Sequence, residues 1–153
     1  MKLEDLQPGD LIFDHSHDLF GLLIRKITKS WANHVALYIG EGKVIEANPG
    51  GIKINSVNKY LFPILRKVSI FRIKASEKQL NHMIENAKLM QDSKYDYFQI
   101  ISLLFLYITK LDKKVHGFQV NKFTICSELI DVSAENAGIN FTNKYSSNVT
   151  PND

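Results

Sequence analysis

The sequence predicts a single α+β domain in which an antiparallel β-sheet packs against helices. Its 153 residues are 44% hydrophobic and 23% charged, which is the profile of one globular domain able to bury a core. The first half contains short β-rich runs separated by glycines and prolines, and the second half contains longer segments with helical spacing. No internal repeat or low-complexity segment divides the chain, so one domain is expected to span residues 1–153.

The β-rich runs predict the strands of the sheet. They are rich in Val, Ile and aromatic residues, and turn-forming glycines and prolines lie between them. The expected strands are residues 11–13, 33–40, 43–47, 52–57 and 67–73. We expect these strands to form an antiparallel sheet.

The glycine-rich segment Gly40-Glu41-Gly42 predicts a hairpin between the second and third strands. If these three residues form the loop, Ile39 pairs with Lys43. A two-residue loop would shift the register by one residue and exchange the faces on which the side chains of one strand lie.

The register decides which polar side chains share a face with His34. With the three-residue loop, Asn48 lies directly across from His34, and Glu46 is its diagonal neighbour. Diagonal neighbours have Cβ atoms about 7–8 Å apart, which allows a glutamate to bond an imidazole. With the two-residue loop, Glu46 would lie on the opposite face. A histidine taken alone in a sheet is more often a structural residue, so both interpretations of His34 are open at this point.

Four segments show the apolar spacing of helices. They are residues 18–28, 76–90, 96–110 and 126–137. Ser76 and Gln79 form the sequence pattern of a capping box at the start of the second. The most apolar stretch, residues 98–111, is 14 residues long. A bilayer-spanning helix needs roughly 20, so we expect a buried helix there and no transmembrane segment.

The last of these helices carries Cys126, the single cysteine of the chain. Its inward face would consist of Cys126, Leu129, Ile130, Ser133, Ala134 and Ala137, and Gly138 would end the helix. Cys126 thus lies in the first turn, where unpaired backbone N–H groups and the helix dipole favour a nucleophilic thiolate. The alternative is a small packed hydrophobic residue, the commoner role of a lone cysteine on an apolar face.

Composition and charge indicate which partners, compartment and ligands to expect. The net charge of +3 is spread along the chain without a long basic run, so we expect no nucleic-acid partner. A single cysteine cannot form an intrachain disulfide, and residues 1–8 contain no apolar leader, so a cytoplasmic location is expected. His15 and His17 offer two imidazoles, but no third ligand is evident nearby, and a zinc site needs three or four. We expect neither a metal nor a cofactor.

Several motifs together resemble one known family. They are Gly9-Asp-Leu-Ile-Phe13, His34-Val-Ala-Leu-Tyr-Ile-Gly40, Val44-Ile-Glu-Ala47, Cys126-Ser-Glu-Leu-Ile130 and Ala137-Gly-Ile139. Their order and spacing are similar to those of the circularly permuted NlpC-type papain-like thiol hydrolases, in the YiiX-like branch. In that family the histidine strand and the acidic strand precede the cysteine helix, whereas in papain-like enzymes the cysteine comes first. The resemblance implies a circularly permuted papain-like fold.

The resemblance also implies a role for each of three residues. Cys126 would be the nucleophile, His34 the general base and Glu46 the group that orients the imidazole. The chemistry agrees, because an imidazole can hold a cysteine as a thiolate and later protonate the leaving group. A backbone N–H near the start of the cysteine helix can stabilise an oxyanion. Asn48 is the alternative to Glu46, since an asparagine orients the histidine in papain-like enzymes.

The implied activity is that of a cysteine amidase or peptidase acting on an amide bond of a peptide or an acylated small molecule. Lipid acyltransferases of the lecithin retinol type belong to the same superfamily, but their motif Asn-Cys-Glu-His-Phe differs from Ile125-Cys-Ser-Glu128. An apolar acyl pocket could still be lined by Phe98, Phe105, Phe118 and Phe123. Lipid acyl transfer and a catalytically silent binding module are therefore the two alternatives, and the sequence does not distinguish the substrates.

Overall fold

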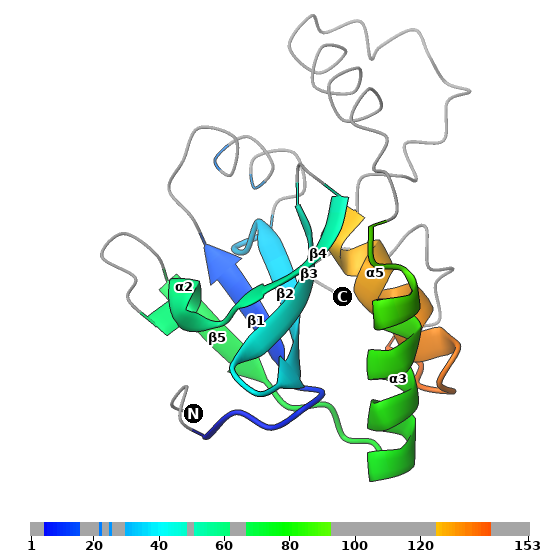
Figure 1. Ribbon diagram of the computed structural model, residues 1–153. Coiled ribbons are helices and arrows are strands. Elements are labelled where there is room, and N and C mark those ends of the chain that lie inside the picture. The colour runs from blue at the N-terminus through cyan, green and yellow to red at the C-terminus, as the bar shows by residue number, and fades with distance from the viewer. Residues whose placement is uncertain are drawn as a thin grey trace, which may run out of the picture.

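The computed structural model describes residues 5–15, 22, 25, 30–48, 51–61, 67–92 and 125–141. Within these ranges, five strands form one antiparallel sheet in the order β4-β3-β2-β1-β5 (Figure 1). The strands are β1 (Leu11–His15), β2 (His34–Gly40), β3 (Lys43–Asn48), β4 (Gly51–Ser56) and β5 (Lys67–Phe71). The helices are α2 (Asn58–Leu61), α3 (Glu77–Leu89) and α5 (Ile125–Glu135). The predicted α+β class with an antiparallel sheet is confirmed.

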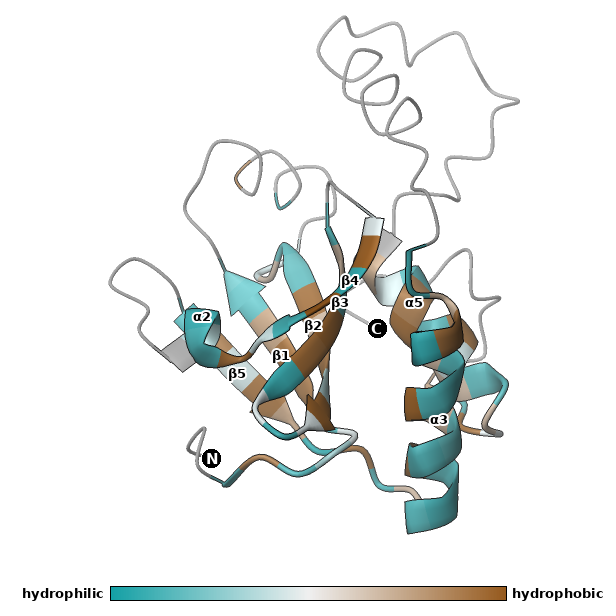
Figure 2. Cartoon of the chain, viewed as in Figure 1, coloured by the Kyte–Doolittle hydropathy of each residue, from teal (hydrophilic) through white to brown (hydrophobic). Residues whose placement is uncertain are grey.

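The sheet separates two hydrophobic clusters. Helices α3 and α5 cover one face, and the short helix α2 lies on the other (Figure 1). The larger cluster, between the sheet and the two long helices, includes Leu37, Ile45, Met83 and Leu129. The smaller cluster, on the α2 side, consists of Ile12, Ala36, Val44, Val57 and Tyr60. Figure 2 shows hydrophobic residues along the central strands and hydrophilic residues on the outer side of α3.

The hairpin between β2 and β3 has a different loop from the predicted one. Gly40, and not Ile39, pairs with Lys43, so the loop between the paired residues is two residues long. Both loop residues have positive φ angles, 51° and 67°, as a tight hairpin turn of this kind requires. A bulge shifts the register between Tyr38 and Gly40.

This bulge keeps the side chains on the faces predicted for them. The extra residue in β2 compensates for the shorter loop, so that Leu37 pairs with Ile45, as the three-residue loop would require. Without the bulge, a two-residue loop would place Glu46 on the opposite face from His34. With it, the two side chains lie on the same face.

The predictions for α3 and α5 are confirmed. The capping box is present, because the Gln79 N–H donates to Ser76 Oγ and the Ser76 N–H donates to Gln79 Oε1. Helix α5 begins at Ile125, so Cys126 lies in its first turn. The remaining inward positions are buried, namely Leu129, Ile130, Ser133, Ala134 and Ala137. Gly138 has a φ of 72°, the left-handed conformation common just after a helix.

Two predicted helices lie outside the described residues. These are the apolar helix at residues 96–110 and, apart from residues 22 and 25, the helix at residues 18–28. In the part of the chain that the structure describes, every helix is too short or too polar to cross a membrane. The single domain over residues 1–153 stays a prediction.

Candidate active site

His34 and Glu46 are hydrogen-bonded across neighbouring strands of the sheet. His34 is the first residue of β2, Glu46 lies in β3, and His34 Nε2 is 2.7 Å from Glu46 Oε2. The imidazole is 17% exposed and the carboxylate is fully buried. Asn48, the alternative partner, lies at the end of β3 opposite Gly51; among the described residues it forms no hydrogen bond with His34. Of the two partners predicted for His34, the structure therefore places Glu46 in contact with it.

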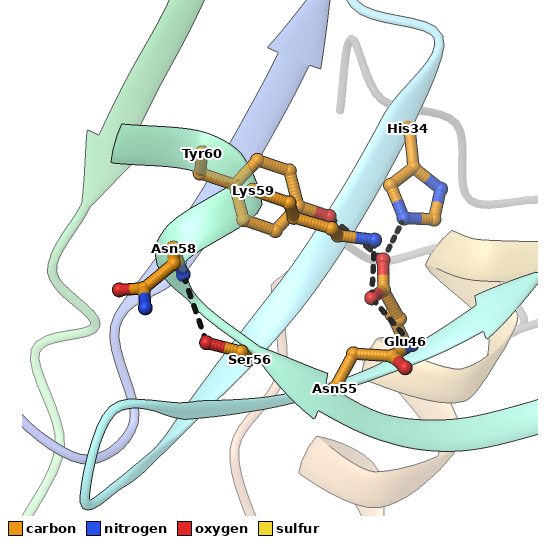
Figure 3. A network of polar contacts seen from close by, with 7 residues as sticks. All are labelled: His34, Glu46, Asn55, Ser56, Asn58, Lys59 and Tyr60. Atoms are coloured by element: carbon orange, nitrogen blue, oxygen red, sulfur yellow. Dashed lines mark hydrogen bonds and ion pairs between the residues drawn. The ribbon is translucent and has the colours of Figure 1, made fainter. Parts of the chain in front are cut away.

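Three further side chains surround the Glu46 carboxylate (Figure 3). Tyr60 Oη donates a hydrogen bond to Oε2 at 2.7 Å, and Asn55 Nδ2 donates one to Oε1 at 2.9 Å. The Lys59 ammonium forms an ion pair with Oε1. In Figure 3, Lys59 and Tyr60 reach this carboxylate from α2, Asn55 reaches it from β4, and His34 reaches it from β2.

These contacts keep Glu46 ionised although it is buried. Burial acts to raise the pKa of the carboxyl group, because it disfavours the charged form. The hydrogen bond and the positive charge of His34, followed by those of Lys59, outweigh burial and hold the pKa of Glu46 well below its ordinary value of 4.5. An ionised carboxylate can only accept hydrogen bonds, so Glu46 accepts a hydrogen bond from the His34 Nε2–H.

Cys126 interacts with the same imidazole. The thiol is partly buried and forms a side-chain hydrogen bond with His34. Since Nε2 is occupied by Glu46, we infer that the bond to sulfur uses Nδ1. The backbone N–H groups of Val35 and Ser127 also hydrogen-bond the sulfur. The nucleophile predicted from the sequence therefore lies where a strand and the first turn of a helix both present donors to it.

The proton affinities of the thiol and the imidazole are shifted in opposite directions. Burial acts to lower the pKa of His34, but the hydrogen bonds and negative charges of Cys126 and Glu46 raise it to about 9. Burial acts to raise the pKa of Cys126, but the hydrogen bond and charge of His34 and the backbone donors of Val35 and Ser127 lower it below the ordinary 9.0. These shifts favour a thiolate and an imidazolium at neutral pH, the reactive state of a cysteine nucleophile.

Sequence reasoning did not find the groups around Glu46. Lys53 pairs with Glu46, and Asn55 lies two residues further along β4, so its side chain is on the same face as Glu46. A correct strand register would have indicated this residue. Lys59 and Tyr60 belong to a helix of four residues. A segment of that length shows no helical periodicity, so no pattern in the sequence indicated that these side chains return to the sheet.

Other side chains considered from the sequence lie apart from this arrangement or outside the described ranges. His15 Nδ1 contacts the carbonyl oxygen of Trp31. His17 is not among the described residues. The phenylalanines suggested for an acyl pocket, Phe98, Phe105, Phe118 and Phe123, are also outside them. Within the described ranges, no group of three or more His, Cys, Asp or Glu side chains is arranged to hold a metal ion.

The fold and the site together define the class of protein. A sheet that carries a histidine and an acid on successive strands, followed along the chain by a helix that begins beside a cysteine, is a circularly permuted papain-like arrangement. Residues 5–141 match the family of permuted papain-like amidase enzymes, YaeF/YiiX, C92. The chain belongs to this family. This confirms the resemblance seen in the sequence, and a family of amidases agrees with the expected enzyme class.

The chain is also similar to a protein of Escherichia coli (strain K12) called probable lipoprotein peptidase YaeF. The two are 30% identical over 107 residues, which is 69% of this chain and 39% of that protein. The match thus spans about two fifths of the length of the relative. Because the match covers only part of the relative, the activity of that protein supports a proposal about this chain and does not establish it. The expected cytoplasmic location stays a prediction.

Proposed function

We propose that this protein is a cysteine-dependent hydrolase of the amidase or peptidase type, with Cys126 as nucleophile, His34 as general base and Glu46 as the residue that orients His34. The observation that supports it best is the path of hydrogen bonds from Cys126, at the start of α5, through His34 to Glu46. Nucleophile, base and orienting acceptor in contact, in that order, are the parts that a catalytic triad needs.

In the first half of the reaction, the Cys126 thiolate attacks the carbonyl carbon of an amide and forms a carbon–sulfur bond. The carbonyl electrons move to oxygen, and a backbone N–H near the start of α5 stabilises the resulting oxyanion. When the oxyanion collapses, the carbon–nitrogen bond breaks. The His34 imidazolium gives its proton to the leaving nitrogen, so that an amine departs and a thioester remains on Cys126.

In the second half, water replaces the amine. The neutral imidazole of His34 removes a proton from water as the oxygen attacks the thioester carbonyl. Collapse of the second tetrahedral intermediate breaks the carbon–sulfur bond, releases a carboxylic acid and restores the thiolate and imidazolium. Glu46 stays ionised throughout and keeps the Nε2 proton in place, which leaves Nδ1 free for both proton transfers.

The family and the relative support one substrate class over the others. A family of amidases and a relative named as a peptidase support an amide bond in a peptide or an acylated small molecule. Lipid acyl transfer differs from hydrolysis only in the acceptor of the acyl group, so both classes belong in one assay.

The test offers the purified protein two sets of substrates. One set contains short peptides of the cell-wall type, and the other contains medium-chain acyl amides and esters with and without an acceptor alcohol or amine. We expect release of an amine from members of the first set, and none from the matched Cys126→Ala protein. Turnover restricted to acyl esters in the presence of an acceptor would identify an acyltransferase instead. Absence of turnover in both sets, with an unreactive Cys126, would indicate a binding module.

A further inference from the structure

The segment from Asn55 to Tyr60 occupies both oxygens of the Glu46 carboxylate. Oε2 accepts hydrogen bonds from His34 Nε2 and from Tyr60 Oη, each at 2.7 Å. Oε1 accepts from Asn55 and pairs with Lys59. The oxygen that holds the imidazole is therefore the same oxygen that Tyr60 holds (Figure 3).

The fold keeps this segment in a fixed position relative to the hairpin that carries His34 and Glu46. The Val57 N–H donates to the Gly42 carbonyl at 2.8 Å, and the Tyr60 N–H donates to the Val57 carbonyl at 2.9 Å. The tyrosine itself is fully buried in the cluster on the α2 side of the sheet. Its hydroxyl is thus placed by the packing of the ring and by the backbone.

We propose that Tyr60 and Asn55 are positioning residues of the active site, which hold the Glu46 carboxylate in the one orientation that aims Oε2 at His34. This inference rests on the proposed function and extends it to a fourth and a fifth residue. A glutamate has three rotatable side-chain bonds, so a partner on each oxygen is needed to fix its carboxylate. Tyr60 and Asn55 supply these partners from neutral groups, and Lys59 supplies the compensating charge.

A purely structural role is the competing explanation, because a buried tyrosine hydroxyl needs a partner in any case. The two explanations differ in what they predict for Cys126. If Tyr60 acts through Glu46, loss of its hydroxyl weakens the hold on the imidazolium and so lowers the thiolate fraction. If it serves only the fold, the melting temperature falls while the reactivity of the thiol stays the same.

The experiment measures the rate of alkylation of Cys126 by iodoacetamide at pH 6. The chain has one cysteine, so the rate reports this thiol alone. The variants are Tyr60→Phe and Asn55→Ala, each alone and in a Glu46→Ala background. Tyr38→Phe is the matched control, because the Tyr38 hydroxyl accepts a hydrogen bond from the Gly42 N–H, and its ring packs against the same cluster as Tyr60. Thermal melts establish that each variant is folded.

We expect Tyr60→Phe to lower the rate at pH 6 about three- to ten-fold, the effect of one hydrogen bond, and Asn55→Ala to lower it by a similar or smaller factor. Neither change should lower it further in the Glu46→Ala background, and Tyr38→Phe should alkylate like the wild type. A rate that is unchanged or raised in both folded single variants overturns this inference and leaves the proposed function standing. The same loss with and without Glu46 also overturns it. A wild-type thiol no faster than free cysteine overturns the proposed function and this inference together.

Discussion

His34 Nε2 lies 2.7 Å from Glu46 Oε2, although the loop that joins their strands is one residue shorter than the loop from which this neighbourhood was predicted. The bulge between Tyr38 and Gly40 accounts for the agreement, because it adds to β2 the residue that the loop lacks. The relative placement of the two side chains therefore depends on a local irregularity of one strand. Loss of that bulge would turn Glu46 to the opposite face without changing any residue of the site.

The first prediction concerns the reactivity of Cys126. We expect it to react with iodoacetamide at pH 6 faster than free cysteine, because His34 and the backbone donors lower the pKa of the thiol. Each unit by which a thiol pKa falls raises the thiolate fraction at this pH about ten-fold. His34→Ala should remove most of this advantage. A wild-type thiol that still titrates near its ordinary pKa of 9.0 would leave Cys126 as a packing residue.

The second prediction concerns pH. With the pKa of His34 raised to about 9, the imidazolium that protonates the leaving amine persists through neutral pH and is lost as the pH rises through about 9. An ordinary histidine would lose it above 6.5. An NMR titration of the imidazole protons, assigned with His34→Ala, gives the midpoint directly. Cys126→Ser should lower this midpoint, since the hydrogen bond with Cys126 is the largest of the effects that raise the pKa.

The third prediction concerns the support beneath the nucleophile. Leu129 lies one turn after Cys126 on the inward face of α5 and is 1% exposed. Leu129→Ala should lower the free energy of unfolding by about 2–5 kcal/mol, the usual cost of removing a buried leucine side chain. Chemical denaturation measures this loss. The leucine side chain cannot hydrogen-bond the sulfur, so the folded variant should retain the raised thiol reactivity at pH 6. Complete loss of that reactivity would show that helix packing sets the position of Cys126.

The elements that could be predicted from the sequence are those with a repeating or local signal. The spacing of apolar residues after Cys126 was sufficient to place it in the first turn of a helix, and the pair Ser76 and Gln79 was sufficient to locate the start of another. The neighbourhood of His34 and Glu46 was predicted with the correct faces but the wrong loop, because a bulge leaves no mark in the alternation of residues. Tyr60 was not found, since a four-residue helix has no period and its contact is tertiary.

The last prediction separates Glu46 from Asn48 as the residue that orients His34. We expect Glu46→Gln to fold, because the amide oxygen can accept from His34 and Tyr60 while Asn55 turns its own amide to accept from the new NH₂ group. The Lys59 ammonium loses its partner in this variant, but its side chain is 36% exposed and can turn to solvent. The variant keeps the imidazole tautomer but loses the negative charge that stabilises the imidazolium. Its turnover should therefore fall by about one to two orders of magnitude, with KM little changed.

Glu46→Ala should lose more of both activity and stability, because it leaves His34, Tyr60 and Asn55 facing a buried cavity without their acceptor. Breaking a buried ion pair in this way costs about 3–5 kcal/mol, which thermal and chemical denaturation can measure. Asn48→Ala is the control, and we expect turnover within about two-fold of the wild type, since Asn48 forms no hydrogen bond with His34 among the described residues. If Asn48→Ala instead loses most of its turnover while Glu46→Gln keeps it, the orienting residue is Asn48. The roles proposed for Cys126 and His34 would be unaffected by that result, because neither depends on which acceptor holds Nε2.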